Sequence, residues 1–182
     1  STIIIIDTIC AEEELYDLKE GVKNVVLGLT DERFAVISLN CSGDVTLHSS
    51  CSVDQNLVFS VNHSNEFKHT SKLDEGYFMK HIRNAQDKIW FETESEIAAA
   101  FTSLKLKKSA TDKKRPKRAT GLAIFLAAIL SKLPTARTFS HILSFLAGPC
   151  TKGPGKVISR DCKQHIRQQR DFNSNSLKYY YT

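Results

Sequence analysis

The sequence predicts an α/β fold, with a mostly parallel sheet that carries helices on both faces and has an antiparallel edge strand. Two short segments, 3–6 and 34–39, are apolar at consecutive positions, which is typical of strands buried on both faces. Segments with helical spacing follow at 11–29, 93–104 and 119–133. Because strands and helices alternate along the chain, we expect parallel strands joined by helical crossovers.

The first half of the chain predicts a strand, a helix, a second strand and a hairpin. Asp7 ends the first strand, and Glu12, Glu13 and Glu14 lie in the first turn of the helix, where the helix dipole favours negative charge. Turn-forming residues at 41–44 precede 45–48, which we expect to be the antiparallel edge strand. The polar stretch 49–90 is expected to be a long surface excursion with one short helix near 77–84.

The second half predicts two helices, a basic loop and a last strand. Thr93 and Glu96 have the capping-box spacing at the start of the first of these helices. Residues 105–118 contain eight basic side chains and one acid, which predicts a solvated basic loop. The helix over 119–133 is apolar nearly all round and is expected to be buried, as is the strand over 139–147. Sites are expected at the carboxyl ends of the strands, near Asp7, Asn40 and Gly148.

Composition and charge favour one globular domain. The 182 residues are 41% hydrophobic and carry a net charge of +5, which permits an anionic partner without requiring one. The five cysteines form no C-x-x-C pair, so we interpret them as reduced thiols of a cytosolic protein. The longest apolar stretch, 121–130, is shorter than the roughly 20 residues that span a bilayer, and the first residues do not resemble a signal peptide.

No catalytic motif stands out. The glycine-rich loop at 148–155 has proline at 154, where a phosphate-binding loop needs lysine, so a rigid turn is the better interpretation. Cys150 with His141 or His165 is the one nucleophile arrangement worth naming, and scattered histidines make such pairs common. The basic loop leaves three interpretations open: a solvated loop, a nucleic-acid or nuclear-import segment, and a surface that faces anionic lipid.

Several positions resemble the von Willebrand A fold. They are Asp7 after the first strand, Thr120 and Gly121 with Ala123 at the head of the buried helix, and a glycine after the last strand. That family often holds a divalent metal on hydroxyl and carboxylate oxygens. Here Ile9, Ala11 and Ala147 stand where three of those oxygens would be, so no metal site is expected.

Within this fold, the sequence motifs resemble more specifically the trunk domain of the Sec-twenty-three family. The members of that family are the GTPase-activating subunits of the inner COPII coat. The loop from Phe145 to Gly155 carries the resemblance best, and Asp7-Thr8 and the run from Lys114 to Ala123 add to it. The motif residues of this loop are Gly148, Pro149, Thr151, Gly153, Pro154 and Gly155. The resemblance covers 1–182 as a partial trunk domain, with a variable insertion at about 49–92 and the basic loop at 105–118.

The resemblance implies a protein-interaction module without catalytic residues of its own, acting in transport from the endoplasmic reticulum to the Golgi. Its expected partners are the cargo-binding COPII subunit, the GTP-bound small GTPase of the coat and the anionic membrane surface, with no nucleic acid. The location implied is cytoplasmic, peripheral on endoplasmic reticulum membrane and COPII vesicles. A metal-free A-type adaptor that binds nucleic acid or nuclear partners through the basic loop is the alternative.

The resemblance also assigns candidate residues and absences. Five cations are candidates for facing the membrane: Lys113, Lys114, Arg115, Lys117 and Arg118. The family's zinc module and its GTPase-activating modules lie outside this stretch, so neither a cofactor nor activation of GTP hydrolysis is expected here. A full A-type sheet needs further strands after the one at 139–147, so the sheet is expected to be incomplete on its C-terminal side.

Overall fold

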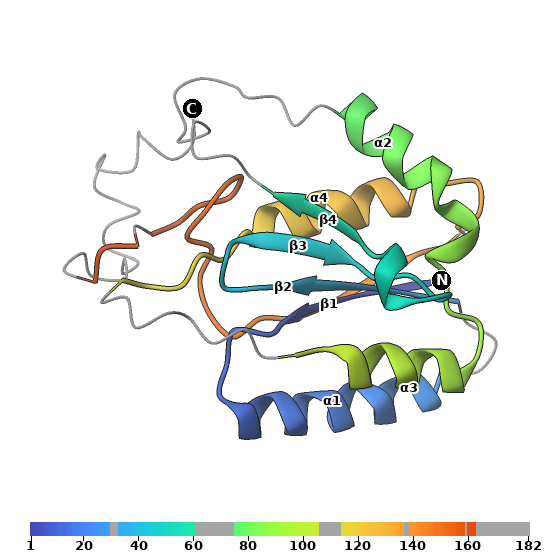
Figure 1. Ribbon diagram of the computed structural model, residues 1–182, viewed down its shortest axis with the longest axis horizontal. Coiled ribbons are helices and arrows are strands. Elements are labelled where there is room, and N and C mark those ends of the chain that lie inside the picture. Colours follow the sequence, from blue (N-terminus) through green and yellow to red (C-terminus); the bar gives the residue numbers. More distant parts are fainter. Residues whose placement is uncertain (30–32, 61–74, 106–113, 137–138, 159, 163–182) are drawn as a thin grey trace.

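The computed structural model describes residues 1–29, 33–60, 75–105, 114–136, 139–158 and 160–162 (Figure 1). Its sheet has five strands in the order β4-β3-β2-β1-β5. The strands are β1 (Thr2–Asp7), β2 (Phe34–Leu39), β3 (Asp44–Leu47), β4 (Leu57–Ser60) and β5 (His141–Phe145). The helices are α1 (Glu12–Leu27), α2 (Glu75–Asn84), α3 (Glu94–Ser103) and α4 (Thr120–Leu130), with short 3-10 turns η1 (Val53–Gln55) and η3 (Gln86–Lys88). The predicted α/β class is confirmed.

Strand β1 is the centre of the molecule. It pairs in parallel with β2 on one side and with β5 on the other, and all six of its residues are buried. Its side chains alternate between the two faces, so Ile3 and Ile5 enter one core while Ile4 and Ile6 enter the other. A strand that is apolar at consecutive positions is therefore buried on both faces here, as its sequence predicts.

Helices cover the two faces of the sheet as separate layers (Figure 1). Helices α1 and α3 lie against one face, where Val22 and Phe101 pack with Ile4. Helices α4 and α2 lie against the other, where Leu122 and Ile82 join the core around Ile5. Each helix contributes one apolar stripe except α4, which is buried along most of its length as its composition predicts.

The predicted starts of α1 and α3 are confirmed by their capping contacts. At α3 the Thr93 hydroxyl accepts the Glu96 amide at 3.3 Å and the Glu96 carboxylate accepts the Thr93 amide at 3.1 Å. The Glu92 amide, which donates to the same Glu96 carboxylate oxygen at 2.9 Å, and the Thr93 amide lower the pKa of Glu96. At α1 the Glu14 carboxylate accepts the Ala11 amide at 2.8 Å. Among the described residues, no helix combines the length and apolar character that crossing a bilayer would take.

The prediction that 45–48 forms the sheet edge is wrong, because β4 pairs with β3 in antiparallel register and lies outside it. The sheet thus has two parallel and two antiparallel pairings and is mixed rather than mostly parallel. Strand β4 escapes sequence detection because only one of its four residues, Phe59, is buried. The interpretation of 49–90 as a surface excursion is also too simple, since Ile82, Ile89 and Trp90 belong to the core.

The prediction that the last strand is buried is wrong as well. Strand β5 spans only His141–Phe145, and its exposure pattern has no fully buried residue. It has one described neighbour, β1, while α4 packs over β1 and β2 rather than over β5. Ile142 is 41% exposed and Phe139, just before the strand, is 79% exposed. Apolar side chains in and before β5 therefore lie exposed at the margin of the sheet.

His48, directly after β3, gives the fold a pH-dependent component. Its ring is buried, and its Nε2 lies 2.8 Å from the Ser38 hydroxyl. Burial lowers the pKa of His48 to about 4.

We expect the free energy of unfolding to fall as the pH decreases from about 6.5, the ordinary pKa of histidine, to about 4. In that interval the unfolded chain binds a proton at His48 that the folded chain does not. His48→Gln should reduce this slope in urea denaturation at a series of pH values, whereas His141→Gln, at an exposed position, should leave it unchanged. An equal slope in wild type and His48→Gln would contradict the assignment.

Candidate functional site

The carboxyl ends of the parallel strands meet at one edge of the sheet, on the left of Figure 1. Asp7 ends β1, the turn from Asn40 to Gly43 follows β2, and the loop that begins at Leu146 follows β5. The segment before α4, residues 114–119, lies at the same edge (Figure 1). We use the name carboxyl edge for this end of the sheet, which comprises the end of β1, the turn after β2, the loop after β5 and residues 114–119.

An ion pair between Asp7 and Arg118 lies at the centre of the carboxyl edge. The Arg118 Nε donates to Asp7 Oδ2 at 2.7 Å, and its Nη2 donates to the Ile9 carbonyl at 2.7 Å. The Asp7 side chain is fully buried, and that of Arg118 is 11% exposed. Backbone amides also donate hydrogen bonds to the Asp7 carboxylate: that of Ile9 to Oδ1 at 2.9 Å and that of Ala147 to Oδ2 at 3.2 Å. A buried charge pair with this many hydrogen bonds holds its neighbours in one arrangement.

Gly148 lies close to the guanidinium. A Cβ atom at Gly148 would lie 2.9 Å from the Arg118 Nη1 and 3.0 Å from its Cζ. A side chain here would have to displace the guanidinium, which Asp7 and the Ile9 carbonyl hold, so glycine suits the loop at this position. The first glycine of the sequence motif is thus explained by close packing.

Thr151 fastens the loop to the segment before α4. Its hydroxyl accepts the Arg118 amide at 2.8 Å and donates to the Pro116 carbonyl at 2.7 Å. In return, the amides of Thr151 and Lys152 both donate to the Arg118 carbonyl at 3.0 Å. Thr151 is buried, and it both accepts a hydrogen bond from the Arg118 backbone and donates one to it.

The remaining motif residues shape the turn. Gly153 and Gly155 have φ angles of +75° and +70°, in the left-handed region that favours glycine. The Pro154 carbonyl comes so near to α4 that a Cβ atom at Gly121 would lie 1.9 Å from it. Glycines at both ends of this contact let the loop lie directly on the start of the helix. Pro149 is partly buried between Gly148 and Cys150.

Cys150 is surrounded by hydrogen-bond acceptors. Its buried thiol lies 3.3 Å from the Arg118 carbonyl, 3.4 Å from that of Lys152 and 3.5 Å from that of Pro154. His141 lies exposed at the start of β5, and His165 falls outside the described residues. The surroundings of the thiol offer carbonyl oxygens and no described imidazole, which is unlike a nucleophile with its base.

The residues at the carboxyl edge do not fit a divalent metal. The Asp7 carboxylate is committed to Arg118, and Ile9, Ala11 and Ala147 offer no side-chain oxygen. Within the described ranges, no three His, Cys, Asp or Glu side chains come together in a way that could hold an ion. The positive charge that balances Asp7 is supplied by the chain itself.

The five candidate membrane-facing cations separate into different environments. Lys114 is exposed, and Arg115 and Lys117 are partly buried, while Lys113 lies outside the described residues. Arg118 is buried against Asp7 and leaves this set. The basic run of the sequence hides this difference, because nothing in the run itself marks which cation turns inward. The sequence signal that points to a buried cation is Asp7. Its carboxylate follows four consecutive isoleucines, and a carboxylate buried with them requires a buried hydrogen-bond donor.

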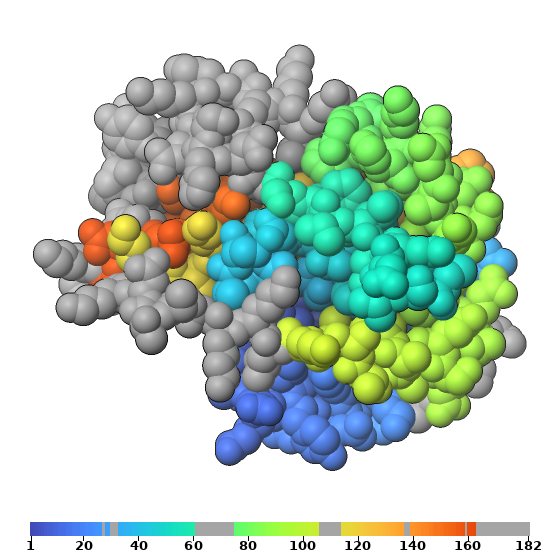
Figure 2. All heavy atoms as spheres, viewed as in Figure 1, coloured from blue at the N-terminus to red at the C-terminus, as the bar shows by residue number. Residues whose placement is uncertain are grey.

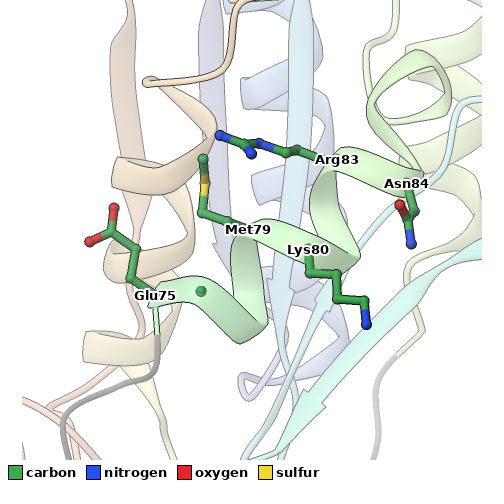
Figure 3. A pocket seen from close by; sticks show the side chains of 6 residues that line it. Glu75, Met79, Lys80, Arg83 and Asn84 are labelled. Atoms are coloured by element: carbon green, nitrogen blue, oxygen red, sulfur yellow. The ribbon is translucent and has the colours of Figure 1, made fainter.

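A hollow of about 600 Å³ lies elsewhere, along α2. Figure 3 shows Glu75, Met79 and Arg83 pointing to one side of this helix and Lys80 and Asn84 to the other. Lys132 forms an exposed ion pair with Glu75 at 3.1 Å at its margin. The lining mixes both charges with one thioether and holds none of the residues singled out from the sequence.

Removal of the Arg118 side chain should destabilise the fold strongly. We expect Arg118→Met to lower the free energy of unfolding by about 3–5 kcal/mol, because Asp7 is then buried without its cation. In a double-mutant cycle in urea, Asp7→Asn with Arg118→Met should lose clearly less than the sum of the two single changes.

Lys114→Met, at an exposed position four residues earlier, is the matched control and should change stability by no more than about 0.5 kcal/mol. If Arg118→Met does not fold, Arg118→Lys supplies the cycle, since it keeps the charge and loses the forked geometry. Strict additivity in the cycle would show that the pair is not coupled.

No family model matches the chain. The chain is 36% identical over 180 residues to the GTPase-activating protein NEL1 of Saccharomyces cerevisiae, an alignment that covers 96% of the chain and 29% of that protein. It is 38% identical over 66 residues to protein transport protein SEC23 F of Arabidopsis thaliana, covering 36% of the chain and 8% of that protein. With SEC23 C of the same plant it shares 37% identity over 67 residues, which is 37% of the chain and 9% of that protein.

The chain spans less than a third of the length of these relatives, and only the alignment with NEL1 runs along nearly all of it. The chain is therefore homologous to NEL1 and the SEC23 proteins over a part of their length.

Proposed function

We propose that this chain is the von Willebrand A-like trunk domain of a Sec-twenty-three-type coat subunit and works as a protein-interaction module. The observation that carries the proposal is the 36% identity to a GTPase-activating protein along 180 residues. The two SEC23 proteins to which shorter stretches of the chain align are protein transport proteins, and this supports a role in transport. The motif loop adds support, because its glycines and Thr151 are bound into the carboxyl edge rather than left as a free surface loop.

In this proposal the chain pairs with the cargo-binding subunit of the COPII coat and contacts the GTP-bound small GTPase of that coat. It acts in transport from the endoplasmic reticulum to the Golgi, in the cytoplasm and peripherally on the membrane. The chain has no catalytic residues or cofactor of its own for this role, so binding rather than GTP hydrolysis is its contribution. In this proposal a further strand pairs with β5, and such a strand would cover the exposed side chain of Ile142.

The membrane-facing role belongs to the exposed side of the basic segment. The proposal keeps four of the five candidate cations: Lys113, Lys114, Arg115 and Lys117. It leaves out Arg118, whose side chain pairs with Asp7 in the interior. Exposed lysines near an anionic bilayer each contribute about 1 kcal/mol, and salt screens that attraction.

The partner assignment is tested by a pull-down with the chain as bait. We expect it to capture the purified cargo-binding coat subunit, and the coat GTPase when that is locked with GTP but not when it is locked with GDP. Competing nucleic acid should leave the capture unchanged. Capture of nucleic acid alone would contradict the proposal and favour an A-type adaptor that uses its basic loop for nucleic acid.

The membrane assignment is tested by charge reversal. Lys114→Glu with Lys117→Glu should weaken cosedimentation with vesicles that contain anionic lipid, and the difference should shrink as the salt concentration rises. Lys80→Glu with Lys88→Glu makes the same change in net charge at exposed positions on α2 and η3, and should have much less effect. Equal loss in both variants would reduce the role to net charge and remove the assigned face.

A further inference from the structure

The outer edge of β4 is an open side of the sheet. Strand β4 is the last strand in the sheet order, beyond β3. Figure 2 shows the atoms of η1 and β4 at the surface, between those of α2 and α3. Val58 on the strand is 60% exposed, and Val53 on η1 is 63% exposed. Apolar residues therefore stand at the surface along a strand edge that no described strand pairs with.

The pairing of β3 shows which backbone groups of β4 point outward. The His48 amide donates to the Val36 carbonyl in β2 at 2.9 Å. Because consecutive residues of an antiparallel strand direct their backbone groups to opposite sides, Leu47 bonds to β4 instead. Leu47 pairs with Leu57, so the next residue of β4, Val58, directs its amide and carbonyl away from the sheet. Within the described ranges, no hydrogen bond reaches these two groups.

This edge lacks the features that keep exposed strands apart. Natural edge strands are commonly protected by charged side chains, by proline or by a bulge. Residues 56–60 contain neither a charged residue nor a proline, and β4 pairs with β3 in unbroken register. A strand edge of this kind is a template for another strand.

A second copy of the chain fits this edge through a two-fold axis at Val58. In that antiparallel arrangement, Val58 exchanges both of its backbone hydrogen bonds with Val58 of the second copy. Leu57 then lies opposite Phe59 of the second copy, on the face where both residues already pack in the core, so the apolar layer continues across the axis. A residue on a two-fold axis meets itself, and valine there avoids the repulsion that a charged residue would cause.

The polar residues beside the axis are complementary in donors and acceptors. Asn56 lies opposite Ser60 of the second copy in this register. The Asn56 Oδ1 already accepts the Ser49 amide at 2.8 Å, which leaves its Nδ2 as a donor. The Ser60 hydroxyl donates to the Asp44 Oδ1 at 2.5 Å, which leaves its oxygen as an acceptor. A donor thus meets an acceptor on each side of the axis, and this favours a second copy over an unrelated strand.

We propose that β4 pairs with β4 of a second copy, so that two chains form a two-fold dimer with one continuous sheet. The strand has four residues, so the contact is small and the dimer belongs to the weak class of interfaces. This surface is separate from the carboxyl edge, which lies at the ends of the parallel strands.

The first test is sedimentation equilibrium of the full chain over a concentration series that reaches the high micromolar range. The average mass should rise from monomer towards dimer. Val58→Lys and Val58→Glu each place like charges on the axis and should weaken dimerisation roughly tenfold or more. Since Val58 is exposed, both variants should keep the wild-type circular dichroism spectrum. Val25→Lys, at an exposed valine on α1, should leave the dissociation constant unchanged.

The second test locates the axis. An equimolar mixture of the Val58→Lys and Val58→Glu variants should recover the dimer as a heterodimer in native mass spectrometry, because opposite charges now meet. Cα atoms of a hydrogen-bonded antiparallel pair lie about 5.5 Å apart, within the range of a disulfide. Oxidised glutathione should therefore link the two introduced thiols of Val58→Cys, and the linked peptide identifies them. Wild type, in which Cys51 and Cys162 are exposed, gives the background.

A wild type that stays monomeric at every concentration overturns the proposal. A dimer that both charge variants leave intact also overturns it, because that dimer uses another surface. If wild type is monomeric and Val58→Lys loses capture of the cargo-binding coat subunit, the edge belongs to that partner and the dimer is again refuted. Self-association is measured without coat proteins, so a failed pull-down with an intact dimer would remove the coat role alone.

Discussion

The buried pair of Asp7 and Arg118 is the interaction on which the carboxyl edge depends. One carboxylate gathers donors from its own strand end, from the segment before α4 and from the loop after β5. The other features of the edge follow from where the guanidinium lies. Gly148 leaves room for it, Thr151 holds its backbone, and the loop can then lie close enough to α4 to require Gly121. Segments more than a hundred residues apart are thus fixed by one charge pair, since Asp7 and Arg118 are separated by 111 positions.

This pair also explains how the charge of Asp7 is balanced inside the fold. A carboxylate buried at the end of a central strand must be balanced, and a divalent ion or a side-chain cation can do this. Here the cation is covalently part of the chain, so the geometry of the edge is set when the protein folds and does not vary with the supply of an ion. This matters for the proposed role in protein interaction, because the loops that a partner would meet are held in one conformation before binding.

Local sequence patterns predicted much of the fold, and the failures have a common cause. Ile3 to Ile6, the capping box at Thr93 and the apolar α4 each carry their structure in a few adjacent residues, and each is found as expected. Strand β4 and the exposure of β5 depend on which strand lies next to which, and four or five residues do not encode that. The site shows the same limit. The motif glycines stood out in the sequence, whereas the role of Arg118 needed knowledge of where Asp7 lies, because its neighbours in the run are equally basic.

The basic run therefore contains both a buried structural cation and exposed cations, and variants of the run must keep these two kinds apart. Arg118 turns inward and stabilises the edge, while Lys114 stays exposed and Lys117 lies along the β2–β3 turn beside Lys152. Any charge-neutralising variant that includes Arg118 leaves Asp7 unpaired in the interior, so lost binding would then report unfolding rather than a lost contact. Among the described residues Asp7 is the one buried carboxylate, and Arg118 already satisfies it. Because the buried cation differs from the exposed ones, the surface charge can vary without loss of the fold.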